Sequence, residues 1–299
     1  GLPAEDDLPP VLLDLAVPHE DIDELIALRT VLLTDPDLRW LLTSCTSALV
    51  QGVGSIDQQL DLPLLPEDLG AVGRYFYVLV FVAALPHAQA HHRERGIPPD
   101  ISRRTLADLG RNMAVHRRRR GTGGLHVPFW LKNHFRGELY QLGRLQFQRA
   151  RLGNRTGQAL RASGLSLGRG DPCLAVHIPE FSGRLTPRPC DQSLALARDF
   201  FPRHFPDEEY TVAACYSWLL DPQLKEYLPV DANIVRFQER FRTAYEVREV
   251  NDADTLTFVF GDPDISWDTL PRRTTLERAI GDHLRSGRHW HGGNGWMTL

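Results

Sequence analysis

The sequence predicts an α+β protein in which a helical N-terminal domain, residues 1–120, is followed by a mixed α/β domain, residues 121–299. Apolar residues recur every three or four positions through much of the first 115 residues, as they do along the buried face of a helix. Beyond the glycine-rich stretch 121–124, aromatic and β-branched residues alternate with polar ones, which is typical of strands. A chain of 299 residues is long enough for two such domains.

Helical spacing in the N-terminal domain covers residues 22–33, 38–50 and 69–85, and another short helix is expected at 102–115. Pro36 and Pro66 lie where helices are expected to begin, and each has acidic neighbours that favour a helix start. The longest apolar run, 75–85, is too short to cross a bilayer, and the first ten residues lack the pattern of a secretion signal. We therefore expect a cytoplasmic protein that does not bind membranes.

The composition excludes several functional classes. A hydrophobic fraction of 42% and a charged fraction of 24% are those of a folded globular protein, and a net charge of −4 gives no overall attraction for nucleic acid. Four cysteines without a C-x-x-C pair predict reduced thiols and no metal site. His87, His91 and His92 lack the glutamate of a zinc-binding HExxH motif, so we expect them at a solvated helix end. The arginine run 117–120 is interpreted as a helix C-terminus.

In the C-terminal domain, strands are expected at 138–149, 173–178, 210–220, 245–250, 255–260 and 292–299. Helices are expected at 190–201 and 233–241. A further helix follows Thr274, where Glu277 completes a capping box.

A strand, a Gly/Pro-rich loop and an amphipathic helix follow one another over residues 174–201. The start of a helix after a strand offers free backbone N–H groups to a phosphate, and Arg184 and Arg188 add positive charge. An ordinary connection between a strand and a helix accounts for the same residues.

Short segments spread over nearly the whole chain resemble the actinobacterial acyltransferase-domain proteins, which pair a helical N-terminal domain with a C-terminal domain of the GNAT acyltransferase superfamily. The segments are GRYFY at 73–77, ALPH at 84–87, LADLG at 106–110, LGRLQF at 142–147, VHIPE at 176–180, SWLLDP at 217–222 and NIVRFQ at 233–238. The resemblance implies a GNAT-like fold and direct transfer of an acyl group to an amine acceptor. The donor would be acyl-CoA or the phosphopantetheine of an acyl carrier protein, with no metal.

In the GNAT fold the acyl-CoA lies in a cleft between the fourth and fifth strands, which correspond by order to residues 173–180 and 210–219. Its pyrophosphate lies on the loop that opens the next helix, here 183–193. This chain departs from the usual loop of closely spaced glycines, since only Gly183 is present, with Pro187 and Pro189 nearby. The residues that the resemblance implies for cofactor binding are Gly183, Arg184, Leu185, Arg188, Asp191, Gln192, Ser193 and Asn233.

Acyl transfer to an amine needs a base for the amine proton and a proton donor for the departing thiolate. Glu180 is the first candidate base, because the superfamily often places a glutamate on this strand, and His177 is the second. The two would face opposite sides of a regular strand. Ser217, Tyr216 and Tyr227 are candidate proton donors.

Each candidate also has a structural interpretation. Glu180 and His177 would be polar residues satisfied at a strand end, Asn233 a helix cap, and Cys215 a buried strand cysteine rather than a nucleophile. A non-catalytic protein that senses acyl-CoA or binds a partner through the same fold is the alternative function.

Overall fold

The computed structural model describes all residues, 1–299, and divides the chain into two compact units, 1–141 and 142–299. The division therefore follows Gln141 instead of residue 120, where the sequence analysis placed it. Helix α7, Pro128–Phe135, explains the difference, because its Leu131 and Phe135 belong to the buried core of the helical unit. The glycine-rich stretch lies inside that unit, where Gly121 ends a helix in the left-handed conformation.

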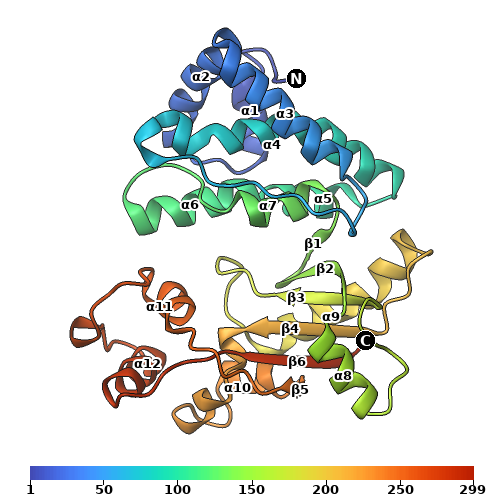
Figure 1. Cartoon of the computed structure of the whole chain (residues 1–299), viewed down its shortest axis with the longest axis vertical. Helices are drawn as coiled ribbons and strands as arrows, with labels where there is room; N and C mark the ends of the chain where they lie inside the picture. The colour runs from blue at the N-terminus through green and yellow to red at the C-terminus, as the bar shows by residue number, and fades with distance from the viewer. The chain divides into compact units, whose positions relative to one another are not determined.

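The first unit is built from helices around α4, Ala71–Glu94, which contacts α2, α3 and α7 (Figure 1). Before α4 come α1, Leu8–Asp14, α2, His19–Thr34, α3, Pro36–Gln51, and the short η1, Glu67–Leu69; after it come α5, Pro99–Leu106, α6, Asp108–Arg120, and α7. The predicted helices 22–33, 38–50 and 69–85 are thereby confirmed as α2, α3 and α4.

Helix α4 is the central element of this core. It is the one helix of the chain that is long and apolar enough to cross a membrane by length and composition, whereas the apolar run 75–85 alone is too short. Of its most apolar window, 67% is buried inside the protein, as expected for the central helix of a folded core. The polar end of α4 is buried too: His91 and His92 are 8% and 1% exposed, so the prediction of a solvated end was wrong for them.

A buried carboxylate joins three parts of the helical unit. Asp21 of α2 is fully buried, accepts a hydrogen bond of 2.7 Å from the hydroxyl of Tyr75, and forms an ion pair with Arg117. Burial, followed by the neighbouring carboxylates, raises the pKa of Tyr75. Arg117 is the first residue of the arginine run, so this run takes part in packing as well as ending α6.

The expected helix 102–115 is two helices. Helix α5 ends at Leu106 and α6 begins at Asp108, whose buried carboxylate lies 2.8 Å from the ring Nε2 of His134. Gly110, the third residue of α6, donates its backbone N–H to the carbonyl of Leu15 and lies so close to Ala16 that a Cβ would not fit. The helical spacing alone did not reveal this interruption, which lies where the chain contacts other elements.

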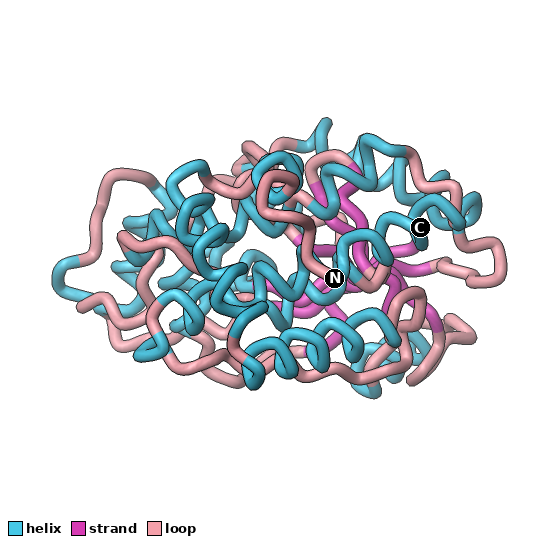
Figure 2. The backbone as a smooth tube through the Cα atoms, turned by 90° about the horizontal axis from the view of Figure 1, so that it is seen from above, coloured by secondary structure: helices cyan, strands magenta, loops and turns pink.

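The strands (magenta in Figure 2) form one six-stranded sheet in the order β1-β2-β3-β4-β6-β5. They are β1, Leu139–Leu142, β2, Leu145–Arg151, β3, Pro172–His177, β4, Val212–Ser217, β5, Arg242–Tyr245, and β6, Gly293–Thr298. From β2 to β5 the neighbours are antiparallel except for β3 and β4, which are parallel. Helix α9, Pro187–His204, connects this parallel pair.

Several sequence predictions in the second unit are confirmed. Strands β3 and β6, helix α9 and α10, Asn233–Gln238, lie where they were expected, and β4 forms most of the predicted strand 210–220 before the 3₁₀ helix η2, Trp218–Leu220. Thr274 caps α12, Thr275–Arg285, and both hydrogen bonds of the predicted capping box with Glu277 are present.

Other predictions there were wrong. The expected strand 138–149 is two strands, β1 and β2, because Gly143, with φ of 71°, turns the chain between them. The expected strand 255–260 is helix α11, Asp252–Phe260, and β5 ends at Tyr245, where the expected strand 245–250 was to begin. Helices α7 and α8, Asn154–Ala162, were not predicted. The remaining 3₁₀ helices are η3, Pro222–Glu226, and η4, Trp267–Thr269.

Helices cover both faces of the sheet. Leu160 of α8 packs with Cys173, Val212 and Trp296, which share one face. Residues next to these in sequence point to the other face, where Arg149 of β2 stacks on the ring of Phe205 at the end of α9, 4.1 Å from its centroid. The face under α8 is the one that carries the candidate site.

Candidate active site

The candidate site lies where β3 and β4 separate. The parallel register joins Leu174 with Ala213 and Ala175 with Ala214, and beyond these two pairs the strands continue to His177 and Ser217 without pairing with each other. The carboxyl ends of parallel strands lie at one edge of a sheet, which is where α/β proteins commonly bind ligands. The side chains that follow the two pairs therefore face one opening.

A cavity of about 280 Å³ opens on the sheet face that α8 covers. His177 of β3 and Tyr216 of β4 both line it. They share this face because Ala175 lies beside Ala214, and each of the two residues is two positions further along its strand. The separation of β3 and β4 thus brings an imidazole and a phenol to one cavity.

The imidazole of His177 is oriented by its neighbour on β2. Its Nε2 lies 2.9 Å from Oε1 of Gln148. Gln148 is opposite Ala175 in the antiparallel pairing of β2 and β3, so its side chain is on the same face as His177. An amide at this distance holds a histidine ring in one orientation, as the partners of functional histidines commonly do.

The hydroxyl of Tyr216 is suited to donate a proton. Tyr216 is 52% exposed, so solvent and ligands can reach it. Partial burial raises its pKa above the ordinary tyrosine value, which outweighs the opposing effect of a hydrogen bond with Asn251. The phenol therefore stays protonated at neutral pH.

The far side of the cavity is formed by β6 and the start of α8. Asn294 of β6 is opposite Tyr216 in the register of β4 and β6. The hydroxyl of Thr156 donates a hydrogen bond of 3.3 Å to Oδ1 of Asn294, which ties α8 to the sheet at this point. Both residues line the cavity.

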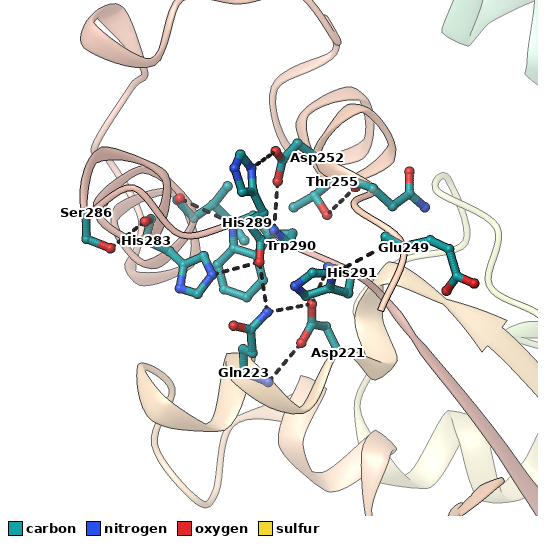
Figure 3. A network of polar contacts seen from close by, with 12 residues as sticks. Asp221, Gln223, Glu249, Asp252, Thr255, His283, Ser286, His289, Trp290 and His291 are labelled. Atoms are coloured by element: carbon teal, nitrogen blue, oxygen red, sulfur yellow. Dashed lines mark hydrogen bonds and ion pairs between the residues drawn. The ribbon is translucent and has the colours of Figure 1, made fainter. Parts of the chain in front are cut away.

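A network of polar contacts fixes the segment that leads into β6 (Figure 3). The carboxylate of Asp252 accepts hydrogen bonds from the ring of His289, 2.6 Å, and from the backbone N–H of Trp290, 2.7 Å. Asp221, 1% exposed, accepts the backbone N–H of His291 at 2.8 Å. Two carboxylates from different parts of the chain thereby hold the start of β6, and so the position of Asn294 in the cavity.

The other two candidate catalytic residues are not brought to this cavity. Strand β3 ends at His177, and Glu180 lies on the exposed turn that follows it, outside the cavity lining. Ser217 follows Tyr216 and so points to the other face; its hydroxyl accepts the backbone N–H of Leu219 at 3.1 Å and caps η2.

The start of α9 is open to an anion, but its backbone offers few donors. Pro187 and Pro189 lack an N–H, so of the first three residues of the helix only Arg188 has a backbone donor, and no side chain caps this end. Arg184 and Arg188 are exposed, as is Gln192. Gly183 has a φ of 81° and open space around the position of a Cβ. An anion here would therefore depend on side chains and on the loop more than on the helix start.

Of the other residues that the resemblance implied for cofactor binding, Ser193 and Asp191 bind other parts of the protein, whereas Asn233 and Leu185 are partly exposed. The hydroxyl of Ser193 is buried and accepts the backbone N–H groups of Arg144, 2.8 Å, and Leu145, 3.2 Å, so it holds the turn between β1 and β2. Asp191 forms an ion pair with Arg240. Asn233 is the first residue of α10 and its side chain does not cap the helix, and Asn233 and Leu185 are both partly exposed.

The thiol of Cys215 is unsuited to nucleophilic catalysis. Cys215 is 1% exposed, and burial raises its pKa to about 12, so the thiolate form is rare at neutral pH. The chain has no group of three or more histidine, cysteine, aspartate or glutamate side chains placed to hold a metal ion.

Sequence reasoning did not single out Gln148, Thr156 or Asn294. The alternation of polar and apolar residues in 145–149 was a signal for Gln148, since it places a polar side chain beside the end of β3. No comparable signal existed for Thr156 or Asn294, because their contact depends on packing between distant segments, and α8 was not predicted.

Two family models together match almost the whole chain. The model described as an N-acyltransferase N-terminal domain matches residues 6–137, and the one described as a GNAT-like C-terminal domain matches residues 139–297. The chain belongs to this family of N-acyltransferases. The boundary between the two matches agrees with the division of the structure after Gln141.

Solved acyltransferase structures are similar to this N-acyltransferase over its full length. One, an acyltransferase in complex with CoA and 10C-teicoplanin, has 39% identity and a TM-score of 0.90, and the match covers 100% of this chain and 90% of the other. A second, in complex with decanoyl-CoA and teicoplanin, has 40% identity, a TM-score of 0.89 and the same coverage. A third, a mutant in complex with octanoyl-CoA, has 39% identity, a TM-score of 0.90 and the same coverage. No curated protein matches the sequence.

Proposed function

We propose that this N-acyltransferase moves an acyl group from acyl-CoA to an amine in the cleft between β3 and β4. The observation that carries the proposal is the pairing of His177 and Tyr216 in one cavity, at the point where the two strands separate. An imidazole and a phenol are a suitable base and acid for this reaction.

His177 is the proposed base. With its Nε2–H donating to the oxygen of Gln148, the neutral ring has its lone pair on Nδ1. The amine nitrogen attacks the thioester carbonyl carbon, and Nδ1 takes a proton from that nitrogen. The new C–N bond forms as the C–S bond breaks, and the electron pair of the C–S bond remains on sulfur.

Tyr216 is the proposed acid. Its hydroxyl gives a proton to the departing thiolate, so that CoA leaves as a thiol. The proton held by His177 then returns to the phenolate through solvent, which restores both groups. The phenol is protonated at neutral pH, so it holds a proton for the departing thiolate.

We propose that the CoA phosphates bind at the loop before α9. Arg184, Arg188 and the open backbone at Gly183 support this assignment, since guanidinium groups bind phosphate well. The loop follows β3 directly, so it leads to the same edge of the sheet as His177. Glu180, on the same turn, is not part of the proposed mechanism.

The relatives support a medium-length acyl group and a large acceptor. Similar acyltransferases have been solved with octanoyl-CoA, with decanoyl-CoA and with teicoplanin. We propose that this chain accepts octanoyl- or decanoyl-CoA as donor and an amine of a teicoplanin-like compound as acceptor. The test described next also includes an acylated carrier protein as an alternative donor.

Release of free thiol tests the proposal. Purified protein is incubated with acyl-CoAs or with an acylated carrier protein, with and without a teicoplanin-type amine, and products are identified by mass spectrometry. We expect thiol release that depends on the amine and equals the amount of acylated amine formed. Thiol release without the amine would indicate a thioester hydrolase, and saturable binding without release would indicate a sensor; either result contradicts the proposal.

A further inference from the structure

We infer that Ala150, Ala175 and Ala214 form the floor of a pocket for the acyl chain and limit the length of chain that the enzyme accepts. This inference rests on the proposed function. The three residues lie on neighbouring strands, β2, β3 and β4, and all line the cavity that holds His177 and Tyr216.

The sheet register places the three methyl groups next to one another. Ala175 lies beside Ala214 in the parallel pair, and Ala150 is diagonal to Ala175, because Gln148 is directly opposite Ala175. All three point to the face under α8. Side chains this small on three adjacent strands leave a hollow in a face that larger residues would fill.

The lining of the hollow suits a hydrocarbon chain. Leu152 and Cys173 continue the alanine floor away from the catalytic pair, whereas His177 and Tyr216 lie at one end. A polar acceptor buried in the hollow would lose hydrogen bonds to water with few groups to replace them, and an alkyl chain loses none. The polar end therefore suits the thioester and the apolar floor its acyl chain.

The direction in which the alanine floor runs and the volume of the cavity both agree with an acyl-chain pocket. From His177 the floor runs back along β3 through Ala175 to Cys173, and four strand residues span roughly 13 Å. The volume of about 280 Å³ is at the lower limit of small-molecule pockets, which are roughly 300–1,000 Å³. The hollow thus has room for part of a ligand, such as an acyl chain, rather than for a whole acyl-CoA.

Enlarging the floor residues tests the inference. We would measure kcat/KM with acetyl-, hexanoyl-, octanoyl- and decanoyl-CoA for wild type, Ala175→Val and Ala214→Val. A methylene group in a fitted pocket changes kcat/KM by about 10- to 200-fold. We therefore expect the ratio of the longest to the shortest donor to fall at least about tenfold in both variants. Ala175→Gly should shift the preference towards longer chains.

Ala213→Val is the matched control, since Ala213 is the buried neighbour of Ala214 on the opposite face of β4. It should leave the donor profile unchanged. Melting curves show which variants fold. If the valine variants do not fold, Ala175→Gly still tests the inference, because it enlarges the pocket instead of narrowing it. An unchanged donor profile with a raised KM for the amine would overturn the inference while leaving acyl transfer intact. Failure of wild type to transfer any acyl group would instead overturn the proposed function.

Discussion

One position along a strand decides which side chains meet in the cavity. Tyr216 and Ser217 are adjacent in β4, but Tyr216 lines the cavity with His177, whereas Ser217 caps η2 on the other face. The alternation of side chains is strict, so a neighbour cannot substitute for a catalytic residue without a change of register. The sequence predicted candidate residues at these two strand ends and could not decide which of them face the cavity.

Replacing Tyr216 with phenylalanine tests the proposed acid. Tyr216→Phe removes the hydroxyl and keeps the ring, so we expect kcat to fall about 100-fold, in the range of general acid catalysis, with a small change in the KM of the amine. The assay is thiol release at saturating acyl-CoA.

Tyr227→Phe is the matched control for that experiment. Its hydroxyl lies 2.9 Å from Nδ1 of His283, within the network that supports β6, and Tyr227 does not line the cavity. Equal losses of kcat in the two variants would show that Tyr216 is not the acid.

At the scale of single residues, the candidate site was only partly predictable. His177 was a candidate because a histidine followed a recognisable strand, and Glu180 ranked above it because the superfamily often uses a glutamate there. The strand ends at His177, so Glu180 is on a turn, and the facing argument applied to a regular strand no longer holds for it. The exact end of a strand depends on hydrogen bonds to its neighbours, which the local sequence does not reveal.

At the scale of elements, periodicity was a better guide in the helical unit than in the sheet unit. The segment 255–260 contains threonine, phenylalanine and valine, which favour strands, yet it forms α11. Asp252 and Asp254 lie in the first turn, where acidic residues stabilise a helix. Val259 and Phe260 pack with Trp290 in a local core. Packing and the helix start together outweigh the strand preference of these residues.

The start of α9 determines which groups can bind the CoA phosphates. With two prolines in its first turn, the helix has few backbone donors, so the side chains of Arg184 and Arg188 should carry most of the phosphate binding. Charged hydrogen bonds contribute about 1.5–3 kcal/mol each, so the Kd of CoA should rise at least about tenfold in the double variant Arg184→Ala, Arg188→Ala. Isothermal titration calorimetry measures this change.

Arg198→Ala is the control for that measurement, because Arg198 is an exposed arginine further along the same helix. It should leave the Kd of CoA near the wild-type value. A double variant that binds CoA as tightly as wild type would show that the phosphates bind elsewhere.

At the scale of the whole molecule, the sequence predicted the order of two kinds of structure but not where one ends. Residues 121–124 looked like a boundary because glycines interrupt a helical pattern. In the structure Gly121 ends α6, and α7 follows within the same core. A glycine that ends a helix and a glycine that separates domains look alike in sequence, and only the packing of Leu131 and Phe135 distinguishes them.

The family resemblance predicted more at this scale than composition did. The arrangement of a helical unit followed by a GNAT-like unit agrees with the two family matches. Composition and charge predicted only that the protein is folded and that its net charge does not attract nucleic acid. The three alanines of the cavity lining and the two prolines at the start of α9 could be interpreted only when the sheet register and the helix bounds were known.

The most direct test of the proposed base compares two substitutions in one assay. His177→Ala and Glu180→Ala are measured for amine-dependent thiol release, with calorimetry to confirm that each still binds acyl-CoA. If His177 is the base, kcat falls at least about 100-fold in His177→Ala and changes little in Glu180→Ala. A large loss in Glu180→Ala with near-normal activity in His177→Ala would contradict the assignment of the base and the location of the active site at the cavity between β3 and β4.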